Sequence, residues 1–347
     1  MEKIKFTFVF VALFSLIGCT NQQTPETDAT KLYPAKDSIG ESWGFINEKG
    51  KFVIPSSFNM ASVFSCGYAR VVMNDGYKFI NKKGTVCSTL SFDNASDFYY
   101  GYSTIMLDGD YGLLDKNMNM VIQPQFKALG LMGDNGLIAA KREYDSNYEY
   151  MDVNENTKIP PMFDYADAFK DGIAIVKVSG KYGAINPSGD FAIQPTYKYP
   201  LENLGNGLIS YRSDDFKLGI LNKQGEVVVA SEYVQFGQVG EGLIPFMSKS
   251  DWGYMNTKGE IVIPAMYSNA KPFNEGYAWV KQSTFGNYYC INTDAQVVFE
   301  LPESEVPVNE FHNGLSLVQS DDSCKYVNSK GNVIYSWPGQ IYGYIND

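Results

Sequence analysis

One unit of about 35 residues recurs along most of this 347-residue chain. Its clearest mark is an apolar residue followed by Asn or Asp, which returns every 34 to 37 residues. The nine copies are Ile46-Asn47, Ile80-Asn81, Leu114-Asp115, Met151-Asp152, Ile185-Asn186, Leu221-Asn222, Met255-Asn256, Ile291-Asn292 and Val327-Asn328. Tandem copies of a short unit fold as an array in which each copy packs on its neighbours. One array therefore explains the folded part of the chain without a second domain.

A second motif, Phe-x-x-Gly, runs in phase with the first. It starts at Phe64, Phe98, Phe169, Phe273 and Phe311, and Gly136, Gly207 and Gly242 mark relaxed copies. Between the two motifs lie short runs of apolar, aromatic and β-branched residues, which favour strands. We therefore predict an all-β fold of about nine repeats, each with three short strands.

The turn between the second and third strand has the pattern Asn-x-x-Gly, as from Asn256 to Gly259. Asn hydrogen-bonds its own backbone in such a turn, and Gly accepts a positive φ. Successive residues of the second strand, such as Tyr254 and Met255, are both apolar, although they point to opposite faces. Such a strand must be covered on both sides, which one repeat alone cannot achieve.

These units resemble the WG repeat. The resemblance is carried by Trp43-Gly44-Phe45-Ile46-Asn47 and Trp252-Gly253-Tyr254-Met255-Asn256 and extends over residues 32–337, although the literal Trp-Gly pair occurs only twice. It implies a β-rich repeat of the kind found in bacterial secreted and lipid-anchored proteins. It implies no catalytic residues, and we expect no cofactor.

The array could be open, like a β-solenoid, or closed, like a β-propeller. Propellers usually have four to eight blades of four strands, and nine blades of three would be unusual. They also often close by sharing a blade between the two chain ends, and no split repeat is evident. We therefore expect the open array. The last segment, Tyr342–Asp347, copies part of the second strand and would cap an open end or latch a ring.

The N-terminus has the layout of a secretory signal. Lys3 and Lys5 precede an apolar run, residues 6–17, which is too short for a membrane span. The run ends in Leu16-Ile17-Gly18-Cys19, which resembles the lipobox of bacterial lipoproteins. We predict a signal peptide over residues 1–18, lipidation of Cys19, a flexible tether over 19–31 and a repeat domain over 32–347. The expected location is the cell envelope, at the outer membrane, with the membrane as one partner through the lipid anchor.

Charge and histidine content exclude several functions. The chain has 28 basic and 39 acidic residues, a net charge of −11, which argues against nucleic acid as a partner. Its one histidine, His312, falls at a turn position where other repeats have Ser65, Tyr99, Lys170 or Asn274, so we interpret it as an ordinary turn residue. Histidine-based catalysis and zinc binding are therefore not expected.

The cysteines of the predicted repeat domain are Cys66, Cys87, Cys290 and Cys324. Cys290 and Cys324 have the same parity on equivalent strands of adjacent repeats. They could form a disulfide if those strands stack directly, whereas separate blades would hold them too far apart. The alternative is that all four are free thiols. The absence of a Cys-x-x-Cys pattern argues against a metal site.

Carboxylates gather in the turns between the first and second strands, where they would form an acidic edge or solvated turns. The residues in question are Asp108, Asp110, Asp214, Asp215, Asp321 and Asp322. The opposite turns carry lysines such as Lys49 and Lys258. A glycoside hydrolase needs two carboxylates with unequal environments, and no pair stands out.

Two tyrosine groups are candidates for a ligand surface: Tyr144, Tyr148 and Tyr150 in the most irregular repeat, and Tyr99 and Tyr100. Tyrosines can stack on a sugar or anchor a peptide, but they also pack in β-rich cores. We predict a non-catalytic module that binds protein, peptide or glycan. The alternative is a glycan-processing hydrolase that uses an acidic site.

Overall fold

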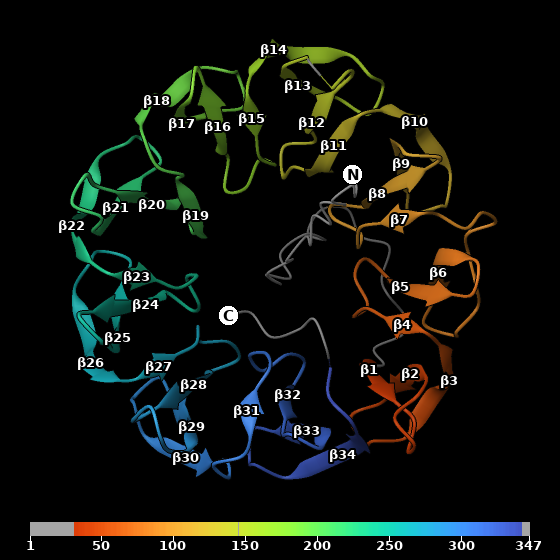
Figure 1. Cartoon of the computed structure of the whole chain (residues 1–347), viewed down its shortest axis with the longest axis vertical. Coiled ribbons are helices and arrows are strands. Elements are labelled where there is room, and N and C mark those ends of the chain that lie inside the picture. Colours follow the sequence, from red (N-terminus) through yellow and green to blue (C-terminus); the bar gives the residue numbers. More distant parts are fainter. Residues whose placement is uncertain (1–30, 145, 342–347) are drawn as a thin grey trace, which may run out of the picture.

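The computed structural model describes residues 31–144 and 146–341, which form nine small antiparallel sheets arranged in a ring (Figure 1). The fold is a nine-bladed β-propeller. The expected open array is therefore wrong, and the closed alternative is correct. The predicted signal peptide, Cys19, almost all of the tether and the segment 342–347 lie outside the described residues.

The blades follow one another along the chain, and each is a meander of consecutive strands. Blade 1 contains β1 (Tyr33–Lys36), β2 (Trp43–Ile46) and β3 (Phe52–Phe58), and blade 2 contains β4 (Met60–Ala61), β5 (Tyr68–Met73) and β6 (Gly76–Asn81). Blade 3 contains β7 (Asn94–Ala95), β8 (Tyr102–Leu107), β9 (Asp110–Asp115) and β10 (Met120–Phe126). Blade 4 contains β11 (Ala128–Met132), β12 (Ile138–Lys141), β13 (Tyr148–Met151) and β14 (Thr157–Phe163). Blade 5 contains β15 (Tyr165–Ala166), β16 (Ala174–Val178), β17 (Lys181–Ile185) and β18 (Phe191–Tyr197). Blade 6 contains β19 (Glu202–Gly205), β20 (Leu208–Arg212), β21 (Leu218–Asn222) and β22 (Val227–Tyr233). Blade 7 contains β23 (Gln235–Phe236), β24 (Leu243–Ser248), β25 (Asp251–Asn256) and β26 (Ile261–Tyr267). Blade 8 contains β27 (Asn269–Ala270), β28 (Tyr277–Lys281), β29 (Tyr288–Asn292) and β30 (Val297–Glu300). Blade 9 contains β31 (Val306–Pro307), β32 (Leu315–Gln319), β33 (Ser323–Asn328) and β34 (Val333–Pro338).

We name the strands of a blade A to D from the centre of the ring outward (Figure 1). The three predicted strands are B, C and D, and the prediction missed strand A. Strand A is often only two residues long, as in β27 (Asn269–Ala270), so it leaves no alternating pattern in the sequence. Seven blades have four strands, whereas blade 1 lacks strand A and blade 2 lacks strand D among the residues described.

The hydrophobic core lies between blades rather than inside them. In the seam between blades 4 and 5, Tyr150 and Phe163 of one blade pack with Phe169 and Val176 of the next. Tyr150 and Phe163 are fully buried. This arrangement confirms the expectation that strands with two apolar faces are covered by neighbouring repeats.

The ring closes through the same contacts that join its other blades. The Tyr326 hydroxyl of blade 9 donates a hydrogen bond of 2.9 Å to the Pro34 carbonyl of blade 1. Tyrosines at the same position of strand C also bond to the next blade elsewhere, Tyr150 to the Asp167 carbonyl at 2.6 Å and Tyr254 to the Lys271 carbonyl at 2.7 Å. In those two seams the acceptor directly follows strand A, whereas Pro34 lies in strand B because blade 1 lacks strand A among the residues described. Over the described ranges, blades 1 and 9 share no sheet. The lack of a split repeat therefore did not indicate an open array, because closure needs only packing.

The glycine of the WG pair lies under the backbone of strand D. A Cβ atom on Gly112 would lie 2.6 Å from the Ile122 carbonyl oxygen, and one on Gly253 would lie 2.5 Å from that of Ile263. Strand D bulges across this point, as the register shift between β9 and β10 shows. This close approach of the two backbones explains why a glycine occupies the position.

We predict that Gly112→Ala lowers the midpoint of thermal unfolding, with a loss of about 3 kcal/mol in stability, because the new methyl group forces strand D away. The control is Gly130→Ala in the next blade, where a Cβ atom has no neighbour nearer than 3.5 Å. That variant should unfold almost like the wild type. Circular dichroism during heating measures both, and equal midpoints would contradict the role assigned to Gly112.

Candidate functional site

The turns between strands A and B link neighbouring blades. Each contains the Phe-x-x-Gly motif or its relaxed form, and the residue before the glycine has a positive φ in most blades, as at Asp171 (58°) and Glu275 (54°). The Glu275 carboxylate accepts hydrogen bonds of 2.7 Å from the backbone N–H groups of Asn313 and Gly314 in the next blade. The Asp171 carboxylate accepts one of 3.2 Å from Gly207. These carboxylates therefore link each turn to the turn of the next blade.

The structure does not bring the two predicted tyrosine groups together. Tyr99 and Tyr100 lie in the A–B turn of blade 3, whereas Tyr144 lies in the B–C turn of blade 4, at the opposite end of the blades. Tyr150 is fully buried in a seam, so it contacts the core rather than a ligand. Tyr148 is half-buried, with the Lys141 ammonium 5.6 Å from its ring centroid. Of the five, Tyr144 is the exposed one, at 70%.

The irregular repeat also contains a buried carboxylate, Glu149. It accepts a hydrogen bond of 2.7 Å from Arg142 and one of 2.6 Å from the Thr157 hydroxyl. A buried charge needs such partners to offset its desolvation. Glu149 is therefore a structural residue of blade 4.

The six predicted acidic-edge residues occupy the B–C turns, or the adjoining strand start, of blades 3, 6 and 9. Two other blades separate each of these from the next, so the residues share one end of the ring but do not form a compact acidic cluster. Asp110 forms an ion pair with Lys127, and a hydrogen bond from Ser213 lowers the pKa of Asp215. Asp108, Asp214, Asp321 and Asp322 are exposed at the surface.

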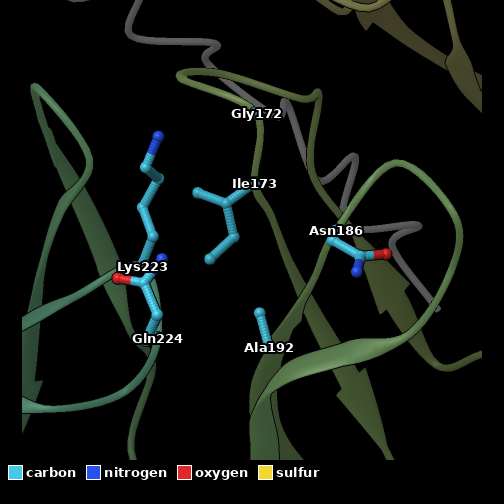
Figure 2. A pocket seen from close by; sticks show the side chains of 6 residues that line it. All are labelled: Gly172, Ile173, Asn186, Ala192, Lys223 and Gln224. Carbon is cyan, nitrogen blue, oxygen red and sulfur yellow. The ribbon is translucent and has the colours of Figure 1, made fainter.

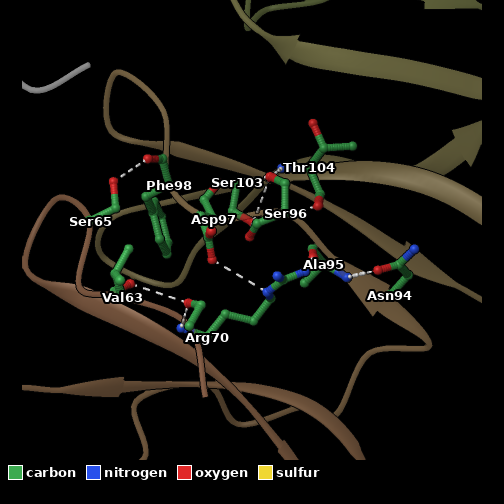
Figure 3. Close-up of polar contacts among 11 residues, drawn as sticks. Val63, Ser65, Arg70, Asn94, Ala95, Ser96, Asp97, Phe98, Ser103 and Thr104 are labelled. Atoms are coloured by element: carbon green, nitrogen blue, oxygen red, sulfur yellow. Dashed lines mark hydrogen bonds and ion pairs between the residues drawn. The ribbon is translucent and has the colours of Figure 1, made fainter. Parts of the chain in front are cut away.

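An ion pair between blades 2 and 3 was not identified from the sequence. The Arg70 Nε lies 3.3 Å from the Asp97 carboxylate, and the same guanidinium donates a hydrogen bond to the Ala95 carbonyl (Figure 3). The Asp97 side chain is 6% exposed. The sequence did contain an indication of this ion pair, because Arg70 is charged at a strand B position where the other repeats have uncharged residues such as Thr104, Ile175 or Trp279.

A shallow hollow of about 460 Å³ lies between blades 5 and 6. Gly172 and Ile173 of an A–B turn line it, together with Asn186, Lys223 and Gln224 of two C–D turns (Figure 2). The Lys223 ammonium donates a hydrogen bond of 3.1 Å to the Asp171 carbonyl, so it is already engaged. The residues that line the hollow include no aromatic side chain on which a sugar ring could stack.

Cys290 and Cys324 are both free, so the possible disulfide between them is not formed. They point the same way within their blades, as expected, but in a propeller this places them in successive seams. Cys290 packs between blades 8 and 9, whereas Cys324 packs between blades 9 and 1. Burial raises the pKa of Cys290 to about 12 and that of Cys324 to about 11, so both thiols are neutral near pH 7.

His312 lies in the A–B turn of blade 9, where its backbone N–H donates a hydrogen bond of 2.7 Å to the Leu315 carbonyl. Burial lowers its pKa. Within the part of the chain that the structure describes, no three His, Cys, Asp or Glu residues are grouped so that they could hold a metal ion. Nor does any helix there have the length and apolar character needed to cross a membrane.

The fold and the repeat define a propeller built from WG units. The family model described as "WG containing repeat" matches residues 43–77, 79–109, 111–144, 150–182, 182–215 and 252–283. These segments make up more than half of the chain, which therefore belongs to this family. The resemblance inferred from the two Trp-Gly units is confirmed.

Comparison with solved structures supports the fold alone. The chain is similar to a structure described as the eukaryotic initiation factor, with a TM-score of 0.64 and 12% identity over 90% of this chain and 96% of that chain. A weaker likeness, with a TM-score of 0.37 and 11% identity, links it to BamB from Moraxella catarrhalis over 80% of this chain and 84% of that one. No curated protein matches the chain.

We predict that Arg70→Ala destabilises the protein by about 3 kcal/mol, because it leaves the buried Asp97 carboxylate without its cation. The double variant Arg70→Leu/Asp97→Leu should recover part of this loss, since no unpaired charge remains. Thermal unfolding of the two variants and the wild type makes the comparison. If Arg70→Ala unfolds like the wild type, the ion pair contributes little to the seam.

Proposed function

We propose that the protein is an exported, lipid-anchored scaffold whose propeller binds a protein, peptide or glycan without catalysing a reaction. The observation that carries this proposal is Tyr144, a large aromatic side chain that is 70% exposed on a turn of a rigid blade. Binding surfaces are often built from such aromatic anchors on loops of a fixed scaffold. The propeller fold shared with other proteins is compatible with this role.

The polar groups inside the seams support a non-catalytic role. The buried carboxylates of Glu149 and Asp97 are each engaged by an arginine of the fold. A general acid or base must be available to a substrate, whereas these groups hold strands and blades in place. The turns at the two ends of the ring therefore remain available to a partner.

The anchor is the second part of the proposal, and it is supported by the sequence alone. An apolar run that ends in Leu16-Ile17-Gly18-Cys19 suits a signal peptide that is cleaved before an acylated cysteine. More than one acyl chain holds a protein firmly to a bilayer. The polar segment after Cys19 would then serve as a tether at the outer membrane.

We predict that Cys19→Ser abolishes acylation and shifts the protein out of the membrane fraction, because the thiol is the proposed site of the lipid. Incorporation of labelled fatty acid and fractionation of cells that express each form measure this. The matched control is Thr20→Ser, which changes the neighbouring residue but keeps the thiol, and it should remain in the membrane. Acylation that persists in Cys19→Ser would refute the anchor.

The binding role can be tested against the hydrolase alternative with the purified full-length protein. A panel of immobilised glycans and peptides is probed for retention of the protein, and soluble glycans are assayed for the release of reducing ends. We expect retention on part of the panel without release of reducing ends. Measurable glycan turnover without retention of any ligand would remove the scaffold function.

A further inference from the structure

The B–C turns differ in length in a way that the repeat does not require. Blades 2, 3, 5 and 7 join strands B and C through two residues, as at 108–109 in blade 3. Four other blades use five or six residues: 37–42 in blade 1, 142–147 in blade 4, 213–217 in blade 6 and 282–287 in blade 8. The intact hairpins of the short-turn blades show that strands B and C pair without the extra residues.

Each of the four long turns holds a large apolar side chain in solvent. The exposed fractions are 69% for Ile39, 70% for Tyr144, 61% for Phe216 and 88% for Phe285. Leaving a side chain of this size in water forgoes the free energy that its burial would contribute. The Phe216 ring has one ring neighbour, Tyr199, at 5.5 Å between centroids, and the Lys127 ammonium lies 5.7 Å from the Tyr144 ring centroid. Because most of each side chain still lies in water, these contacts do not account for the repeated presence of such residues in the lengthened turns.

These four side chains share one end of the ring. All B–C turns lie on the same face, because every blade runs from strand A to strand D in the same direction. The chain enters on the opposite face, where the Lys31 ammonium and the Tyr33 hydroxyl donate hydrogen bonds of 3.2 and 2.6 Å to the Asn313 carbonyl in the A–B turn of blade 9. With the anchor proposed at Cys19, residues 20–31 span at most roughly 40 Å from that face. The B–C face therefore lies at the end of the ring opposite to the point where the tether joins it.

The charge around the apolar side chains indicates the kind of partner. Among the residues that the structure describes, the nine B–C turns contain nine acidic residues and three basic ones, and Asp214 and Asp215 directly precede the turn residue Phe216. An acidic surface repels anionic lipid headgroups and attracts basic groups on a protein. Exposed aromatic residues act as anchors when they enter recesses of a partner.

We propose that the B–C face is a docking surface for a protein partner whose own surface combines Lys or Arg side chains with apolar recesses. Ile39, Tyr144, Phe216 and Phe285 are the anchors, and the turn carboxylates select for basic partners. This inference rests on the proposed scaffold function and assigns it to one face of the ring.

The test uses the full-length protein, purified in detergent, and a library of random peptides displayed on phage as the probe. The selected peptides should be enriched in Lys and Arg together with Leu, Ile or Phe. The triple variant Tyr144→Ser/Phe216→Asn/Phe285→Ser, which we call the tip variant because it changes residues at the tips of three long turns, should bind the tightest peptide at least about tenfold more weakly. Asn is chosen at position 216 because Phe216 has a φ of 64°, a conformation that Asn tolerates.

The matched control replaces three apolar side chains on outer strands that are also more than half exposed: Val227→Ser/Ile261→Ser/Val297→Ser. Their exposed fractions are 61%, 57% and 54%, so both variants should fold like the wild type, which thermal unfolding checks. The control should bind the same peptide within about twofold of the wild type, and added salt should weaken binding to both.

Three results would overturn the docking surface. If the selected peptides are acidic, or bind the tip variant and the wild type equally, binding lies elsewhere and the scaffold function survives. If vesicles of phosphatidylethanolamine and phosphatidylglycerol bind through the tips instead, the partner is lipid rather than protein. If the wild type selects no peptide, both the docking surface and a protein-binding scaffold are refuted.

Discussion

The packing of apolar strand faces against the neighbouring blade holds this structure together. A blade of three or four short strands has no interior, so its aromatic residues can be buried only in a seam. Core clusters accordingly combine residues of adjacent blades, and the largest joins blades 9, 1 and 2. In an open array, Tyr33 and Trp43 at one end and Trp337 at the other would be exposed to water. Closing the ring buries all three, which contributes several kcal/mol.

The seams also determine where polar chemistry can occur. Hydroxyl groups such as that of Tyr254, turn carboxylates such as that of Glu275 and the Arg70–Asp97 ion pair all connect one blade to the next. They are structural, because each of them is engaged with a group of the neighbouring blade. The turns are under less constraint, since extra residues there do not disturb a seam. Variation between otherwise similar blades therefore occurs at the B–C turns, where a partner can reach it.

The sequence identified part of the candidate site. It singled out the irregular fourth repeat, and Tyr144 is indeed exposed there, but Tyr150 is buried because its position in strand C faces a seam. Arg70 and Asp97 lie in different repeats, so their pairing depends on how blades are placed side by side. Phe216 and Phe285 were missed because a single aromatic residue in a turn has no periodic signal. A comparison of turn lengths across the repeats would have found them.

Local rules of strand alternation and turn geometry were enough to predict the number of units, the B–C–D hairpins and the Asn-x-x-Gly turns. Three further features emerged only from the folded molecule: the units form a ring, a short fourth strand lies at its centre, and Cys290 and Cys324 face different seams. The same alternating pattern suits a solenoid and a propeller. The choice depends on the angle between neighbouring units, which the shapes of the side chains packed in the seams determine.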